Sequence, residues 1–155
     1  MERTLVLAKP DAVQRGLVGQ ILARFEDKGL RLVGMKMRVF PKSLLEQHYS
    51  VHKERPFFGS LVQFMGSGPV VALAIEGKDA ITVVRTMMGA TNAAKADPGT
   101  IRGDYGISFS NNLVHGSDGP ETAKTELALF FPEAEELIDW TPCNLEWVYS
   151  KEEEL

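Results

Sequence analysis

In the stretch Pro69-Val-Val-Ala-Leu-Ala-Ile75, every residue after the proline is apolar. A strand with one face in water alternates apolar and polar residues, whereas a strand covered on both faces is apolar throughout. The stretch therefore predicts a β-strand that has no exposed face.

The segments on the N-terminal side of this strand predict two further strands and three helices. Residues 4–9 form a short apolar run that ends at a Pro-Asp pair, which is typical of a buried strand entering a turn. Apolar residues then recur at helical spacing up to Gly29, and residues 30–40 mostly alternate apolar with polar, as in a strand with one wet face. Two helices that begin at Ser43 and Pro56 form a helical hairpin.

The C-terminal side predicts a helix, a long loop, a strand and a last helix. Asp79 caps the first helix, which ends before Gly89. Residues 90–110 show no strong periodicity, and a loop of this length is uncommon in a compact domain unless it is functional or disordered. The last strand runs into His115, and Pro120 lies in the first turn of the last helix.

This order of elements resembles β-α-β-β-α-β and predicts an α+β, ferredoxin-like sandwich. We expect a four-stranded antiparallel sheet covered by helices on one face, with the helical hairpin inserted and a long phosphate-binding loop. Residues 1–155 are expected to form a single domain.

Composition narrows the class of protein. The chain has 44% hydrophobic residues and no apolar run long enough for a membrane span or signal peptide, so we expect a cytoplasmic protein. Its single cysteine, Cys143, cannot form an internal disulfide and is expected to be a partly buried small side chain. A net charge of −4 argues against a surface that grips nucleic acid, so a phosphate-binding site must be local.

The common nucleotide and metal motifs are missing. The sequence contains no Walker A, GxGxxG, CxxC or HExxH pattern. His48 and His52 are spaced to share one helix face and could hold a metal, but without a third ligand nearby the pattern favours surface histidines.

One histidine lies among small polar residues, in Asn112-Leu-Val-His-Gly-Ser-Asp118. A helix start follows, with Ser117 or Asp118 as N-cap, and helix N-terminal amides can hold an anion. The stretch is equally typical of an ordinary loop histidine bonded to backbone, so it does not identify a site alone.

Separated cations and hydrogen-bonding residues could complete a phosphate site. Arginine and lysine suit phosphate oxygens, and threonine or asparagine can bind phosphate or ribose hydroxyls. Each of these side chains alone is more typical of a solvated residue or a local brace, and only the fold can bring them together: Lys9, Arg85, Thr91, Arg102 and Asn112.

Five ordered blocks resemble nucleoside diphosphate kinases, and the resemblance covers nearly the whole chain. The blocks are Lys9-Pro-Asp-Ala-Val-Gln-Arg-Gly-Leu-Val-Gly19, Arg55-Pro-Phe-Phe58, Ser67-Gly-Pro-Val-Val71, Gly99-Thr-Ile-Arg-Gly-Asp104 and Asn112-Leu-Val-His-Gly-Ser-Asp118. The resemblance implies a ping-pong enzyme that transfers the γ-phosphoryl group of a nucleoside triphosphate, typically ATP, to a nucleoside diphosphate and so maintains NTP and dNTP pools. It implies that His115 carries the phosphoryl group as phosphohistidine, with Mg²⁺ bound mainly to the nucleotide phosphates.

The resemblance also implies roles for the other site residues. Glu126 orients the histidine with Ser117 bridging, Tyr49 lies near the phosphoryl group, and Asp118 can touch the water shell of Mg²⁺. Lys9 and Asn112 bind the sugar hydroxyls, and Lys9 also reaches the transferring phosphate. Arg85, Thr91 and Arg102 clamp the phosphates, and Phe57 stacks on the base, a contact that any base can make.

Two positions depart from the family pattern. Ala93 stands where many relatives have proline, which is expected to make the phosphate-binding loop less rigid. Because this loop contributes to subunit contacts in the family, the departure puts the stability of the oligomer in doubt. Phe109 replaces a smaller aliphatic residue near the base. The segment 137–149 resembles the longer C-terminal ending of hexameric relatives, so a homo-oligomer is expected, with a hexamer favoured over a tetramer.

Two other functions compete with the kinase. One is a nucleotide-binding or protein-interaction module that keeps the fold without turnover, against which the presence of every matching catalytic position argues. The other is DNA or RNA binding, which requires a basic stripe that the composition does not supply.

Overall fold

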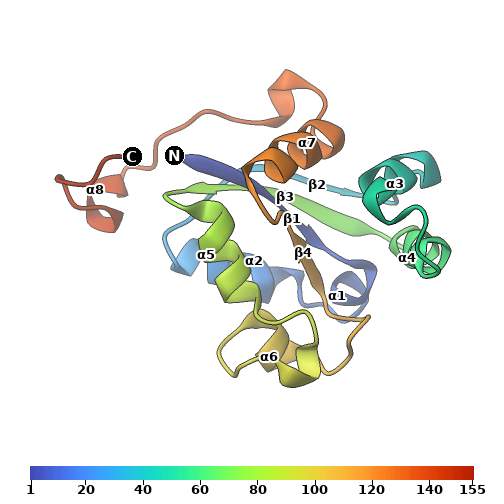
Figure 1. The fold of residues 1–155 in the computed structure, drawn as a ribbon. Coiled ribbons are helices and arrows are strands. Elements are labelled where there is room, and N and C mark those ends of the chain that lie inside the picture. Colours follow the sequence, from blue (N-terminus) through green and yellow to red (C-terminus); the bar gives the residue numbers. More distant parts are fainter.

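The computed structural model describes residues 1–155 and contains a four-stranded antiparallel sheet in the order β2-β3-β1-β4 (Figure 1). The strands are β1 (Glu2–Ala8), β2 (Arg31–Arg38), β3 (Val70–Gly77) and β4 (Val114–Gly116). The ferredoxin-like α+β fold expected from the sequence is confirmed.

Helices cover both faces of the sheet, so the expectation of helices on one face was wrong (Figure 1). One face packs against α1 (Pro10–Gln14), α2 (Val18–Asp27), α5 (Ala80–Met88) and α6 (Ile101–Tyr105). The other packs against α3 (Lys42–His48), α4 (Phe58–Met65) and α7 (Pro120–Phe130). Short 3-10 helices span Ser50–His52, Ala93–Lys95 and Ala134–Glu136, and α8 (Leu145–Val148) lies near the C-terminus.

The apolar run of β3 explains this double cover. All eight of its residues are buried. Val71, Leu73 and Ile75 enter the core cluster on the side of α2 and α5, whereas Val70, Ala72 and Ala74 enter the cluster on the side of α7. Because side chains alternate across a strand, both faces of β3 require an apolar partner.

The helix starts differ from the predicted caps. Pro41 rather than Ser43 precedes α3, and Gly119 rather than Ser117 or Asp118 precedes α7. The Ser117 hydroxyl is fully buried and accepts a hydrogen bond from the Leu5 amide at 3.3 Å, across the sheet, and no side chain caps α7. Tertiary hydrogen bonding therefore decides the role of this serine.

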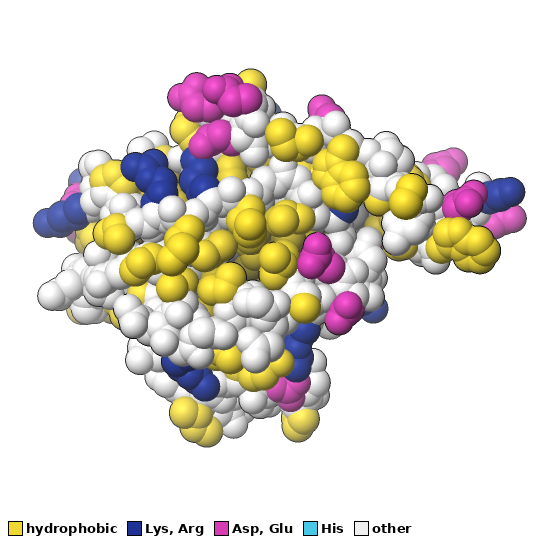
Figure 2. All heavy atoms as spheres, turned by 180° about the vertical axis from the view of Figure 1, so that it is seen from behind, with side chains coloured by type: hydrophobic (Ala, Val, Ile, Leu, Met, Phe, Trp, Pro, Cys, Tyr) yellow, Lys and Arg dark blue, Asp and Glu magenta, His cyan; other side chains and the backbone are white.

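The exposed edge of the sheet carries apolar side chains. On β2 and just beyond it, Met35, Met37 and Val39 are 57%, 58% and 58% exposed, while Lys36 on the opposite face lies over the Phe131 ring. The polar face of β2, which was expected to be exposed to solvent, is thus partly covered, whereas the face that carries the methionines is exposed. Hydrophobic side chains gather on the rear of the molecule (Figure 2), and β2 lies at the far side of the view in Figure 1.

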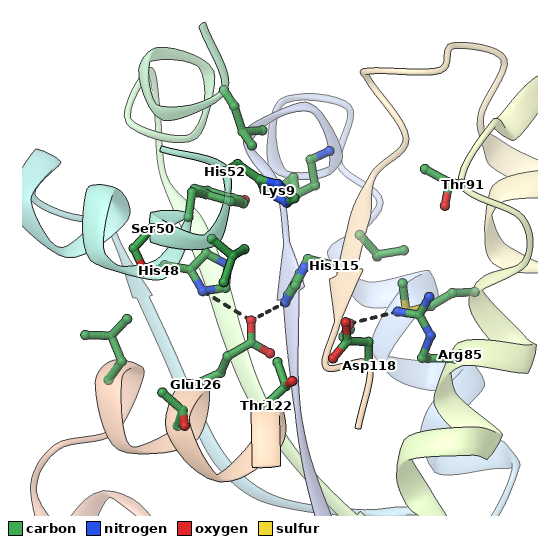
Figure 3. Close-up of a pocket in the computed structure, with 18 of the residues that line it drawn as sticks. Lys9, His48, Ser50, His52, Arg85, Thr91, His115, Asp118, Thr122 and Glu126 are labelled. Carbon is green, nitrogen blue, oxygen red and sulfur yellow. Dashed lines mark hydrogen bonds and ion pairs between the residues drawn. The ribbon is translucent and has the colours of Figure 1, made fainter. Parts of the chain in front are cut away.

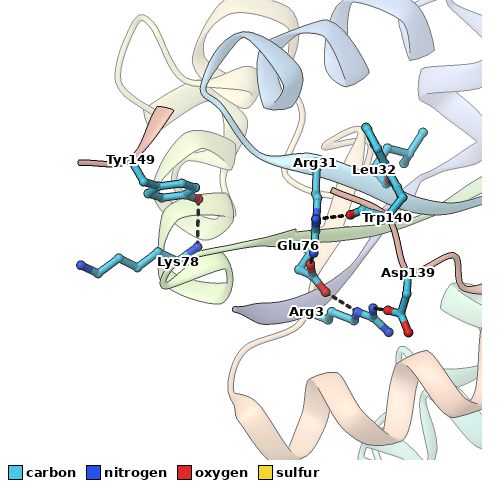
Figure 4. Close-up of polar contacts among 8 residues, drawn as sticks. All are labelled: Arg3, Arg31, Leu32, Glu76, Lys78, Asp139, Trp140 and Tyr149. Carbon is cyan, nitrogen blue, oxygen red and sulfur yellow. Dashed lines mark hydrogen bonds and ion pairs between the residues drawn. The ribbon is translucent and has the colours of Figure 1, made fainter. Parts of the chain in front are cut away.

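A buried carboxylate ties the C-terminal segment to the sheet (Figure 4). Glu76 of β3 accepts hydrogen bonds from Arg3 Nε at 2.5 Å and Arg31 Nε at 2.6 Å. Arg3 also pairs with Asp139, and Trp140 Nε1 donates to the Leu32 carbonyl at 3.0 Å. These contacts hold the chain after α7 against the start of β2.

A helix needs about 20 apolar residues to cross a bilayer. No helix of this chain meets that requirement.

Candidate active site

A cavity of about 830 Å³ opens beside β4 (Figure 3). Its wall combines the α3 region, α5, α7 and the loop after α5. Nine of the residues singled out from the sequence line it: Lys9, Tyr49, Arg85, Thr91, Arg102, Asn112, His115, Asp118 and Glu126.

The other two predicted site residues lie outside the cavity wall. Phe57, just before α4, is 48% exposed, and its ring centroid is 5.3 Å from that of His52, which does line the cavity. Ser117 is fully buried beneath the site. Phe57 therefore lies at the rim, and Ser117 lies behind the wall.

His115 is the middle residue of β4, opposite Leu7 of the central strand β1. Its side chain is 26% exposed, so the ring is reachable from the cavity while the backbone is held in the sheet. The residue that leads into β4, Leu113, has a left-handed φ of +74°.

Leu113 is held in this unusual conformation from both sides. Its amide donates to Asp11 Oδ2 at 3.0 Å, and its carbonyl accepts from the Lys9 amide at 2.8 Å. A bulky residue with positive φ costs roughly 1–3 kcal/mol and persists only where its surroundings impose it. The start of α1 thus fixes the backbone just before His115.

Glu126 of α7 contacts the His115 ring. The Nε2 atom of His115 lies 2.8 Å from Glu126 Oε2. Burial raises the pKa of this carboxyl group, but the hydrogen bond from His115, the charge that this ring carries when protonated, and the Ser117 hydroxyl outweigh burial and bring the pKa below its usual value. An ionised carboxylate only accepts hydrogen bonds, so Nε2 carries the ring proton and Nδ1 keeps a lone pair.

A second histidine of the site was missed by sequence reasoning. The His48 side chain is 1% exposed, so the interpretation as a surface histidine was wrong. Its ring packs edge-on against His115 with centroids 4.8 Å apart, and burial lowers its pKa to about 4. The pattern that could have revealed it is its helical spacing from Leu44 and Leu45, which places it on the apolar face of α3.

Tyr49 follows His48 into the interior. It is 8% exposed, and its ring centroid lies 4.4 Å from that of His48. Burial raises the pKa of its hydroxyl group. The hydroxyl therefore stays protonated and can donate a hydrogen bond.

Lys9 and Asn112 form a buried polar pair. Lys9 Nζ donates to Asn112 Oδ1 at 2.7 Å, and Asn112 Nδ2 donates to the Thr91 carbonyl at 2.9 Å. Burial lowers the pKa of Lys9 to about 8. These contacts join β1, the loop after α5 and the approach to β4 at one point.

Two arginines provide positive charge in different ways. Arg102 uses three N–H groups on backbone carbonyls, those of Asn112 at 3.1 Å, Gly89 at 3.0 Å and Val114 at 2.7 Å. Its burial lowers its pKa to about 10, with Arg85 adding to the effect. Arg85 donates to the Gly116 carbonyl at 3.1 Å and has no carboxylate partner, so its guanidinium remains available to an anion.

The two positions that depart from the family pattern, Ala93 and Phe109, have different surroundings. Ala93 is 3% exposed at the start of a 3-10 turn, where the Asn92 side chain accepts from the Ala94 amide at 3.2 Å. Phe109 is 64% exposed and does not line the cavity. The asparagine cap thus braces the turn in which the family often has proline.

Comparison with known proteins agrees with this geometry. The family model described as nucleoside diphosphate kinase matches residues 2–136. The chain is 58% identical over 149 residues to a nucleoside diphosphate kinase of Picosynechococcus sp., covering 96% of this chain and 99% of that one. It is 52% identical over 151 residues to one of Archaeoglobus fulgidus, with coverage of 97% and 99%.

A solved structure shows the same fold. A halophilic nucleoside diphosphate kinase from Halobacterium salinarum, in complex with CDP, superposes with a TM-score of 0.92 at 51% identity, covering 96% of this chain and 98% of that one. From its sequence, its fold and the matching family model together, the chain belongs to the nucleoside diphosphate kinase family.

Proposed function

We propose that this chain transfers the γ-phosphoryl group of a nucleoside triphosphate, typically ATP, to a nucleoside diphosphate through a phosphohistidine at His115. Phosphoryl exchange between nucleotides is the activity of its family. The observation that carries the assignment of His115 is the 2.8 Å contact between its Nε2 and Glu126, which leaves Nδ1 as a nucleophile without a protein partner.

The two half-reactions mirror each other. The Nδ1 lone pair forms a bond to the γ-phosphorus, and the bond from phosphorus to the bridging oxygen breaks, so that its electron pair leaves with the nucleoside diphosphate. A terminal oxygen of the second nucleoside diphosphate then attacks the same phosphorus, and the N–P electron pair returns to Nδ1. No proton needs to leave the ring, because a neutral imidazole is already nucleophilic.

The surrounding residues are proposed to align the nucleotide. Arg85, Thr91 and Arg102 face the phosphates, where alignment and charge neutralisation supply most of the catalysis. Lys9 and Asn112, already paired at 2.7 Å, bind the sugar hydroxyls.

Three further residues act around this core. Phe57 at the rim stacks on the base, and its 48% exposure leaves part of the side chain open for that contact. Tyr49 lies near the phosphoryl group, and Ser117 supports Glu126 from behind.

Mg²⁺ is the proposed metal, and Asp118 is the residue that would meet it. This exposed carboxylate lines the cavity and has no ion-pair partner, which suits a hard cation that prefers oxygen ligands and keeps several waters. When bound to the nucleotide, Mg²⁺ neutralises developing phosphate charge. The chain contributes Arg85 and Arg102 to the same task and Asp118 to the water shell.

Incubation with γ-labelled ATP tests the proposal. We expect stable labelling in alkali, loss of label in acid, and no label on His115→Ala. The label must also be discharged by added nucleoside diphosphate, with formation of the triphosphate. A wild-type protein that never becomes labelled would contradict the enzymatic function and leave a binding module of the same fold.

The homo-oligomer is likewise a proposal, with a hexamer favoured over a tetramer. The exposed Met35, Met37 and Val39 of the sheet edge support it, because apolar side chains gathered on an edge strand are typical of a surface that a second copy covers. Light scattering of the purified protein measures the assembly directly, and a monomeric mass would refute it.

We place the protein in the cytoplasm, where its nucleotide substrates are found, and treat residues 1–155 as one domain. Cell fractionation tests the first point, and a single cooperative unfolding transition tests the second.

A further inference from the structure

Three potential metal ligands meet at the floor of the cavity. They are His48, His115 and Glu126, and their ligand atoms all lie within 4.8 Å of one another. Glu126 Oε2 is the shared atom, 2.8 Å from His115 Nε2 and 3.2 Å from His48 Nδ1 (Figure 3). Two imidazoles and one carboxylate form a donor set that suits Zn²⁺ and its neighbours rather than Mg²⁺.

His48 supplies the independent observation. Both of its ring nitrogens are buried and neither makes a hydrogen bond, because the 3.2 Å approach of Nδ1 to Glu126 Oε2 does not have hydrogen-bond geometry and Nε2 has no polar contact. An unsatisfied buried polar group costs about 1–3 kcal/mol, so two such atoms on one ring call for an explanation. A ring nitrogen pointing at a carboxylate that already serves a second histidine provides the lone pair that a metal ion needs.

We propose that His48, His115 and Glu126 bind a Zn²⁺-like transition-metal ion, and that the bound ion prevents His115 from accepting a phosphoryl group. Zinc holds nitrogen and oxygen ligands at about 2.0–2.2 Å, so atoms on one ion lie roughly 3–4 Å apart. The 2.8 Å contact must therefore open slightly, and the widest separation, at most 4.8 Å, must close slightly. The ion enters from the cavity, to which the His115 ring is open.

The inhibitory effect follows from which nitrogen of the His115 ring carries the proton, and it rests on the proposed function. A neutral imidazole has one N–H and one lone pair. In the metal-free site Nε2 bears the proton and Nδ1 the lone pair. An ion on Nε2 takes the lone pair there, so the ring proton moves to Nδ1. No proton is gained or lost, yet Nδ1 can no longer form the N–P bond.

Metal binding is measured first, without nucleotide. The metal-free protein is titrated with Co²⁺, whose visible d–d absorption reports coordination by nitrogen and oxygen, and Zn²⁺ is then added to displace it. We expect one saturable site per chain. His48→Asn and Glu126→Gln should each weaken binding by roughly 100-fold or more, since loss of an outer-shell partner alone typically costs 10–100-fold.

His52→Asn is the matched control, because it removes a cavity histidine outside the donor set and should leave the affinity for Co²⁺ unchanged. Thermal unfolding of each variant verifies that it folds, and the second ligand variant keeps the test decisive if one fails. Absence of a saturable site in the wild type, or wild-type affinity in both ligand variants, would overturn the proposal.

The inhibitory effect is measured as the rate of labelling by γ-labelled ATP in excess Mg²⁺, with and without Zn²⁺. We expect Zn²⁺ to slow the wild type at least about tenfold more than His48→Asn, each relative to its own zinc-free rate, since the variant lacks one ligand. Zinc bound to ATP affects both proteins equally. Metal binding without slower labelling would refute the inhibition alone, and absence of labelling without Zn²⁺ would refute the kinase function but not the metal site.

Discussion

At the scale of single residues, the charge on the His115 ring changes during the proposed reaction. When Nδ1 bonds to phosphorus and Nε2 keeps its proton, the ring becomes cationic. Glu126, whose pKa is held below its usual value, faces that proton at 2.8 Å and neutralises the charge. We therefore expect the carboxylate to stabilise the phosphorylated state more than the resting state.

Replacement of Glu126 by glutamine tests this role. The amide is of similar size but has no charge, so we expect kcat to fall by roughly 10²-fold, as for other preorganised electrostatic groups. Glu121→Gln, which removes another carboxylate from the cavity wall, is the control and should change kcat little. Steady-state kinetics would disprove the role if both variants behaved alike.

Lys9 predicts a pH dependence. Burial lowers its pKa to about 8, so the ammonium loses its charge as pH rises through that value. We expect kcat/KM for the nucleotide to fall on the alkaline side of about pH 8, because kcat/KM reports groups of the free enzyme. Lys9→Arg should remove this alkaline limb, whereas an unchanged limb in the variant would assign it to another group.

At the scale of elements, α1 and β4 form one unit. Asp11 near the start of α1 accepts the Leu113 amide at 3.0 Å and so holds the left-handed residue before β4. We expect Asp11→Ala to lower the free energy of unfolding by about 1–3 kcal/mol, since a buried amide loses its acceptor. Asp27→Ala, an exposed change at the end of α2, should have little effect in the same denaturant titration.

Long apolar patterns predicted the elements, and short elements escaped. The continuous run of β3 and the spacing of α2 and α5 identified these elements correctly. Helices α1 and α6 have five residues each, too few for a helical period to be visible. They are tied to each other by a tertiary hydrogen bond, which Arg15 Nη1, just after α1, donates to the Tyr105 carbonyl at the end of α6 at 2.7 Å.

The candidate site was predictable by resemblance and only partly by physics. Nothing in the spacing of Lys9 and Asn112 indicates that they pair, because the pairing depends on β1 and β4 being neighbours. His48 was missed since a histidine near a second histidine suggests a surface, while its apolar helix face indicates burial. The neighbours of a residue in the folded sheet and on its helix face, rather than its residue type, determine whether it lies in the site.

At the scale of the whole molecule, Glu76 joins the sheet to the C-terminal segment. Burial raises the pKa of this carboxyl group, but hydrogen bonds from Arg3 and Arg31 outweigh burial and bring it below its usual value. A carboxyl group whose pKa is lower in the folded protein than in the unfolded chain stabilises the fold at pH values above its pKa in the unfolded chain. This stabilisation is lost as pH falls through its pKa in the folded protein.

Glu76→Gln should therefore flatten the loss of stability in acid. Measured as the free energy of unfolding, the wild type is expected to weaken as pH falls below its ordinary carboxyl pKa of 4.5, and the variant to weaken less. At neutral pH the variant should be less stable by about 1–3 kcal/mol, since two arginines lose their charged partner. Parallel curves for the two proteins would show that Glu76 does not titrate in this way.

The position of β1 between β3 and β4 also bears on how the protein is made. Lys9 must meet Asn112, 103 residues further along the chain, before the cavity wall is complete. Contacts of such long sequence separation form late and slowly in folding. A nascent chain can therefore pair β1 with β3 and still have no catalytic centre, so recovery of phosphoryl transfer after dilution from denaturant should report the last strand closing rather than the first collapse.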